Sequence, residues 1–322
     1  MSEEKMKNVP KKVKKAFHFF NVDKSADRLE RLKETLNKTE IGRDALNFLK
    51  ENEIETAFDK TPNTGYFSPE ENRIALNPYY SDADLALAFI HGARHAQQNA
   101  AMEGPNPKMT VDTMFKAGYM MEADACAAEC VLAHQMKNIG DDSVMKAHQK
   151  SPHKPVSQVF ENEFAKSGNM DKARAAAVLK WYDLPEKQAH AESYIGILKS
   201  ATKAKEKDPS FFTQFLGTPQ VARKILVNRD GKRYIEDKDV SDLCATGIVS
   251  VAGKTADHLV KAGYALGVAY GRSNSSLGLD CIYRKEKGKY SKISYEINAQ
   301  AIIDAGFPHL PIALRMKQQK GR

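Results

Sequence analysis

The chain has 322 residues, of which 42% are apolar and 28% are charged, and its formal net charge is +8. These values are typical of a globular protein with a buried core, organised as one large domain or two ordinary ones. No apolar stretch approaches the ~20 residues that cross a bilayer, and the N-terminus lacks the apolar segment of a secretory signal. The four cysteines form no Cys-x-x-Cys pair, so we expect a reduced, cytosolic protein without a membrane span.

The positive charge gathers in short runs at the two ends of the sequence, residues 11–15 and 315–322. Runs of this kind are usually solvated tails, and residues 1–23 are predicted to be a basic arm. A functional interpretation is a weak attraction to nucleic acid or to anionic lipid. Nucleic-acid binding of this kind would fall steeply with salt.

The first half of the chain predicts two short helices followed by a small sheet. Leucines at helical spacing indicate a helix that starts near Ser25, and a second helix is predicted over residues 41–52. Residues 54–58 are expected to form a strand. Residues 65–67 and 73–76 are expected to form a hairpin around the turn-rich residues 68–72.

Two long helices come next. Ser81 followed by Asp84 resembles a capping box and predicts the start of a helix that ends near residue 100. After a break at residues 104–107, a second helix is predicted over residues 111–138, with Gly140 as its stop.

The remainder of the chain is predicted to be mostly helical. Residues 145–205 continue the helical pattern, and residues 206–322 are expected to be a separate C-terminal region. In that region we predict helices over residues 221–227 and 258–270, and a hairpin whose strands are residues 281–284 and 292–296.

His91 and His95 stand four residues apart on the first long helix. This spacing places both imidazoles on one helix face, one turn apart, which is how a single helix offers two nitrogen ligands to zinc. The alternative is a pair of polar residues on a helix flank. Spacing alone does not separate these two interpretations.

The context of this pair resembles a bacterial family that is described as metallopeptidases and is otherwise of unknown function. In that family a strand and an Asn-Pro turn precede a helix that carries His-Glu-x-Arg-His-Ala-x-Gln. Here the matching segments are residues 73–78 and 91–98, the latter reading His-Gly-Ala-Arg-His-Ala-Gln-Gln. Residues 121–129 match the family's next helix, an acidic residue within a run of small residues, and residues 180–182 with Tyr194 resemble its aromatic segment.

The resemblance implies a zincin-like α+β domain over residues 24–205, with a small antiparallel sheet and two helices that carry the site. It implies His91 and His95 as two zinc ligands and Glu122 as the third. Asp124 would accept a hydrogen bond from a ligand histidine or replace a ligand. Three protein ligands leave the fourth position of the metal for water, which is the catalytic arrangement.

The sequence departs from the family motif at Gly92, where the family has the glutamate that serves as general base. Three hypotheses follow. The protein binds zinc and is a weak or inactive peptidase, or another carboxylate supplies the base, with Glu103 and Asp124 as candidates, or the metal is absent and the domain is a non-catalytic binding scaffold. A peptide or protein is the expected substrate or partner.

The other potential ligands carry no prediction of a metal site. Cys126, Cys130 and His134 share a helix face, but the first and last lie about 12 Å apart along the axis, too far for one metal ion. We expect the two cysteines to pack in the core. Six further histidines show no paired spacing, and we assign no role to them: His18, His148, His153, His190, His258 and His309.

Overall fold

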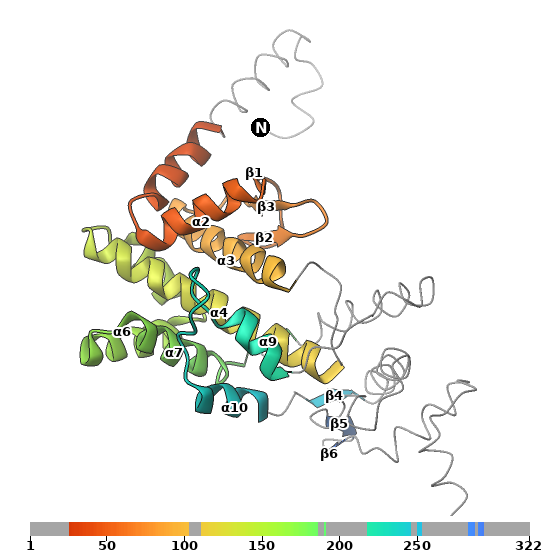
Figure 1. The fold of residues 1–322 in the computed structure, drawn as a ribbon. Helices are drawn as coiled ribbons and strands as arrows, with labels where there is room; N and C mark the ends of the chain where they lie inside the picture. The colour runs from red at the N-terminus through yellow and green to blue at the C-terminus, as the bar shows by residue number, and fades with distance from the viewer. Residues whose placement is uncertain are drawn as a thin grey trace, which may run out of the picture. The chain divides into compact units, whose positions relative to one another are not determined.

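The computed structural model describes residues 26–102, 111–185, 190, 218–245, 250–252, 283–286 and 289–292 (Figure 1). The fold is α+β and mostly helical, as the sequence predicts. It divides into two compact units, residues 1–97 with 128–157 and residues 98–127 with 158–322. Helices α3 (Asp82–Ala101) and α4 (Val111–Asn138) each contribute residues to both units.

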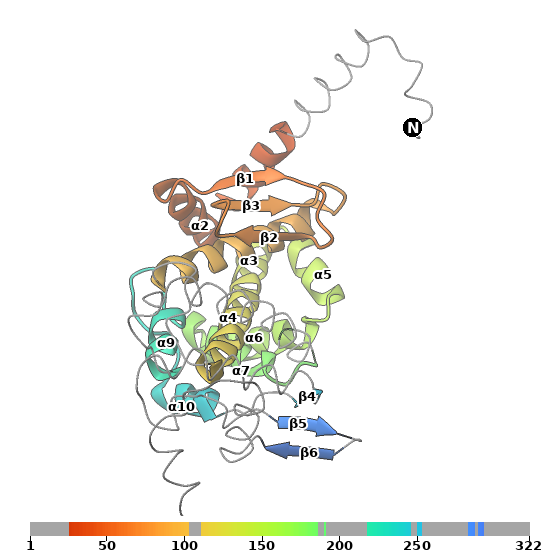
Figure 2. The same cartoon turned by 90° about the vertical axis from the view of Figure 1, so that its right-hand side faces the viewer.

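The sheet of the first unit has three strands, β1 (Glu55–Phe58), β2 (Gly65–Ser68) and β3 (Arg73–Leu76), in the order β1-β3-β2 (Figure 2). Strands β2 and β3 pair antiparallel, which confirms the predicted hairpin. Strand β1 pairs parallel with β3, so the prediction of a purely antiparallel sheet is wrong. The connection over residues 59–64 reverses the chain direction, so β2 runs antiparallel to β1 without pairing with it. Strand β3 reverses direction again and lies between the two, so it is parallel to β1 and antiparallel to β2.

Two helices precede the sheet, one over residues 26–36 and α2 (Glu40–Glu51). Thr39 caps α2, since its hydroxyl accepts a hydrogen bond from the Gly42 amide at 3.1 Å and donates one to the Leu36 carbonyl at 2.9 Å. The threonine is buried, with 2% of its surface exposed.

Thr39→Ala is expected to lower the free energy of unfolding by about 1–2 kcal/mol, because it leaves the amide at the start of α2 without its cap. Chemical denaturation measures this change. Thr39→Ser keeps the hydroxyl and is the control. An equal loss in both variants would contradict a capping role.

Helix α3 begins as the capping-box pattern predicts. The Ser81 hydroxyl accepts from the Asp84 amide at 3.2 Å and donates to the Asp84 carboxylate at 2.6 Å. Arg28 ties this turn to the first helix by donating to Asp82 and to the Pro78 and Tyr80 carbonyls. The start of the helix that carries His91 is therefore held in place.

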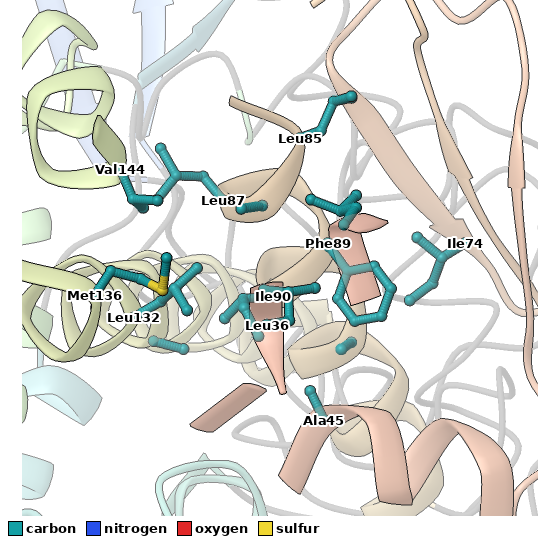
Figure 3. Close-up of a cluster of buried hydrophobic side chains, with 14 of the residues drawn as sticks. Leu36, Ala45, Ile74, Leu85, Leu87, Phe89, Ile90, Leu132, Met136 and Val144 are labelled. Carbon is teal, nitrogen blue, oxygen red and sulfur yellow. The ribbon is translucent and has the colours of Figure 1, made fainter. Parts of the chain in front are cut away.

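The core of the first unit lies between the sheet and the helices α2, α3, α4 and α5 (Ser143–Lys150) (Figure 3). Its most deeply buried members are large apolar side chains from the first helix, β3, α3 and α4: Leu36, Ile74, Leu76, Leu85, Phe89 and Leu132. Burial of this apolar surface is the main source of stability for the unit. It fixes α3 and the C-terminal part of α4 on the sheet.

The second unit includes α7 (Met170–Trp181), α9 (Thr218–Ile225), α10 (Asp237–Ala245) and most of α6 (Lys154–Ser167). It also contains a sheet of β4 (Ser250–Ala252), β5 (Tyr283–Glu286) and β6 (Lys289–Lys292). Helix α9 confirms a helix in the segment predicted over residues 221–227, although it begins at Thr218 and ends at Ile225. The antiparallel pair β5–β6 confirms the predicted hairpin, with its strands closer to the turn than expected.

Several predicted features lie outside the described residues: the basic arm of residues 1–23, the boundary at residue 205, the helix of residues 258–270, Tyr194 and Glu103. Within the described part of the chain, none of the helices combines the length and hydropathy of a bilayer-crossing segment.

Candidate metal centre

His91 and His95 lie side by side on α3. Their Nε2 atoms are 2.9 Å apart, and their ring centroids are 4.6 Å apart with an angle of 78° between the rings. The predicted sharing of one helix face is therefore confirmed. Each ring turns the same nitrogen toward one point, which is what two histidine ligands of a single metal ion require.

Glu129 of α4 contacts the other ring nitrogen of His91, since its Oε1 atom lies 2.7 Å from Nδ1. When Nδ1 donates this hydrogen bond, Nε2 carries the lone pair that a metal ion binds. A carboxylate behind a ligand histidine fixes the ring orientation and raises the basicity of the ligand nitrogen. The contact prepares His91 for coordination through Nε2.

The second oxygen of Glu129 faces two more histidines. Oε2 lies 3.3 Å from Nε2 of His148 and 3.5 Å from Nδ1 of His153. Burial raises the pKa of Glu129, but hydrogen bonds from His148, His153 and His91 outweigh it, so the pKa lies well below its ordinary value. The carboxylate is therefore charged, and three imidazoles surround it.

His148 is fully buried on α5, and its Nε2 lies 3.8 Å from Sγ of Cys130. Burial lowers the pKa of His148, but Cys130 and Glu129 raise it, and the result is about 10. Its other ring nitrogen, Nδ1, is buried and has no hydrogen-bond partner. The predicted core placement of Cys126 and Cys130 is confirmed, since both are fully buried.

Glu122, the third ligand that the resemblance implies, lies on α4 seven residues before Glu129. Two turns of helix separate the two carboxylates, so they share one face of α4. In the second unit, Oε1 of Glu122 lies 3.7 Å from Nδ1 of His190. Its role as a ligand stays a prediction.

Asp124 is fully buried in the second unit and accepts three hydrogen bonds. The donors are Arg174 at 2.7 Å, the Tyr234 hydroxyl at 2.6 Å and Gln98 at 2.8 Å. The Arg174 guanidinium also lies over the Tyr234 ring, 4.0 Å from its centroid. Asp124 therefore anchors a buried ionic network, and its predicted role beside a ligand histidine stays a prediction.

Gly92 lies where α3 passes the central strand of the sheet. A Cβ atom at this position would lie 3.2 Å from Cγ2 of Ile74 in β3, which is tighter than an ordinary van der Waals contact. The first atom of any larger side chain must therefore displace Ile74 by a few tenths of an ångström. The close approach of helix and sheet gives a structural reason for glycine here.

The residues that spacing did not reveal are Glu129, His148 and His153. Each comes from a different part of the chain, namely α4, α5 and the turn before α6. The one signal in the sequence is that Glu129 follows Glu122 by seven residues, which places a second carboxylate on the same helix face. The histidines meet this carboxylate only through the tertiary fold.

The sequence profile of a family described as "Putative metallopeptidase family (DUF6782)" matches residues 12–234. No match was found among the curated proteins or among the solved structures. The family description points to a metal, and the described residues include groups of His, Cys, Asp and Glu side chains close enough to hold one.

Proposed function

We propose that this chain, which belongs to the DUF6782 family of metallopeptidase-like proteins, binds zinc through His91, His95 and Glu122. We further propose that its peptidase activity is weak or lost, because Gly92 stands where the family motif has the general base. The expected ligand of the site is a peptide or a protein segment.

The observation that carries the proposal is the convergence of two Nε2 atoms, one from His91 and one from His95, at 2.9 Å. Two imidazole nitrogens on one helix are a donor set that suits zinc, and an ion bound to both would replace the hydrogen bond between them. The buried carboxylate of Glu129 on Nδ1 of His91 supports the same assignment, because a hydrogen bond donated by Nδ1 places the ring's lone pair on Nε2, the nitrogen that would coordinate. Glu122 is supported by the family motif and by its place on the α4 face that also carries Glu129.

A bound zinc ion would lower the pKa of a coordinated water to ~7 and polarise a substrate carbonyl. The chain must still supply a group that takes the proton from this water, and Gly92 has no side chain to do so. Asp124 is a weak candidate for this task, since an arginine, a tyrosine and a glutamine already donate to its oxygens. This favours zinc binding with poor catalysis over Asp124 as a substitute base, and Glu103, the other candidate, lies outside the described residues.

Zinc content tests the ligand assignment. After zinc loading and dialysis against metal-free buffer, His91→Ala and His95→Ala are each expected to hold one zinc ion fewer than the wild type. Glu122→Gln keeps the shape of the side chain and removes its charge, so zinc should be held more weakly. Elemental mass spectrometry counts the metal, and competition with a chromogenic chelator ranks the affinities.

His134→Ala is the matched control, because His134 is a buried histidine of α4 that lies within hydrogen-bonding distance, 2.9 Å, of Asn138. This variant should keep the wild-type zinc content. A wild-type protein with far less than one zinc ion per chain would overturn the proposal. The proposal is also overturned if His91→Ala holds as much zinc as the His134→Ala control.

A second candidate function is a non-catalytic binding module that keeps the zincin-like scaffold. The observation that favours it is the tight fit of Gly92 against Ile74, which disfavours a glutamate at this position. A metal-free wild type that folds and binds peptide would support this alternative.

A further inference from the structure

We propose a second metal site in this protein, formed by Glu129, His148 and His153, with the thiol of Cys126 as its fourth ligand. It is separate from the His91–His95 pair and does not depend on that pair binding zinc. The expected ion is zinc or another divalent metal that accepts nitrogen, oxygen and sulfur ligands.

The distances around Glu129 distinguish its two oxygens. Oε1 lies 2.7 Å from His91, which is a hydrogen-bonding distance. Oε2 lies 3.3 Å from His148 and 3.5 Å from His153, longer than the usual ~2.9–3.0 Å of an N–H···O bond. Ligand bonds of ~2.0–2.2 Å in a tetrahedral site separate neighbouring ligand atoms by about 3.3–3.6 Å. The spacing on the Oε2 side therefore fits a metal site, in which the ion would replace the long hydrogen bonds from His148 and His153.

The ligand atoms of Glu129, His148 and His153 all lie within 4.8 Å of one another. Cys126 precedes Glu129 by three residues on α4, so its thiol lies on the same side of this helix, one turn away. The four residues supply two nitrogens, one oxygen and one sulfur, a closed set with no position left for water. Such a set is typical of a structural zinc site rather than a catalytic one.

Burial supports the same inference. His148 is fully buried, the Glu129 side chain is 10% exposed, and Cys126 is fully buried. Polar groups withdrawn from water are costly unless each finds a strong partner, and the nearest partner of the His148 Nε2 atom is the Glu129 carboxylate at 3.3 Å. An ion among these groups would compensate the charge of Glu129 and give each ligand atom a strong partner. The side chains come from α4, α5 and the turn before α6, so the ion would join these three segments.

Zinc stoichiometry tests the second site. The wild-type chain, loaded with zinc and dialysed against metal-free buffer, is expected to hold two ions, and His153→Ala is expected to hold one. His153 is the suitable position because its side chain is 24% exposed, so its truncation leaves the apolar core intact. Circular dichroism confirms that the variant is folded before the metal is counted.

Cobalt substitution tests the thiol ligand. Co(II) in the wild type should show a thiolate-to-cobalt charge-transfer absorption in the near ultraviolet, and Cys126→Ser should remove it. Cys244→Ser is the matched control, because Cys244 lies on α10 and is not one of the proposed ligands, and the absorption of this variant should equal that of the wild type. Survival of the band in Cys126→Ser would overturn the cysteine as a ligand.

The two proposals fail in distinguishable ways. If His91→Ala loses an ion and His153→Ala holds as many as the wild type, the second site is overturned and the proposed function stands. The reverse result keeps the second site and overturns the first. If the wild type holds a single ion and both variants lose it, the proposal that the two sites are separate is overturned. A wild type without zinc overturns both proposals.

Discussion

Gly92→Glu is expected to raise zinc-dependent peptide hydrolysis by roughly 10²–10⁴-fold over the wild type, the usual contribution of a positioned general acid–base group. The substitution restores the carboxylate that follows the first histidine in the family motif. This group would take a proton from the metal-bound water and return it to the leaving amine. Release of amino groups from a peptide library measures the change, with and without a chelator.

The same substitution is expected to reduce stability. Its Cβ atom would lie 3.2 Å from Ile74, so either this side chain or α3 must shift. Overpacking of this kind typically costs ~1–3 kcal/mol, and the gain of about 1 kcal/mol in helix propensity over glycine offsets part of it. Thermal denaturation should show a modest loss, and hydrolysis must be measured below the new midpoint.

Gly92→Gln is the matched control, since glutamine has the same size as glutamate and cannot act as a base. It should show the same loss of stability and no gain in hydrolysis. If Gly92→Glu binds zinc and cleaves no peptide, then Gly92 alone does not disable the enzyme. Equal hydrolysis by both variants would also contradict the general-base argument.

Local features of this fold could be predicted because nearby residues determine them. Helix α4 was expected over residues 111–138 and has these bounds, and it stops at Gly140, whose φ of +91° is readily adopted by glycine. The Ser81 cap, the hairpin and the shared face of His91 and His95 follow from spacings of two to four residues. Each is set by backbone geometry within one or two turns.

Features that depend on distant residues could not be predicted in the same way. The parallel pairing of β1 with β3 results from the path of a loop, which hydrophobic patterns do not report. Spacing predicts no role for His148 and His153, because they reach Glu129 only through the tertiary fold. The sequence marks Asp124 as an acid near the site, but no nearby residue predicts its pairing with Arg174, 50 residues later.

The buried pair of Asp124 and Arg174 gives the largest expected effect on stability. Arg174→Ala is expected to lower the free energy of unfolding by about 3–5 kcal/mol, because it leaves a fully buried carboxylate without its cation. It also removes the guanidinium from the face of the Tyr234 ring. Tyr234 is the last residue of the family match, so this network connects the end of the matched segment to α4.

Urea denaturation of Arg174→Ala beside Lys180→Ala measures this contribution within one helix, α7. Lys180 pairs with Asp183 at 3.0 Å, but both side chains are exposed to solvent, by 34% and 67%, so its removal should cost at most about 1 kcal/mol. The two variants are expected to differ in stability because water can solvate the charge of Asp183 but cannot reach that of Asp124. If the two variants unfold at the same urea concentration, the stability of the fold does not depend on the pairing of Asp124 with Arg174.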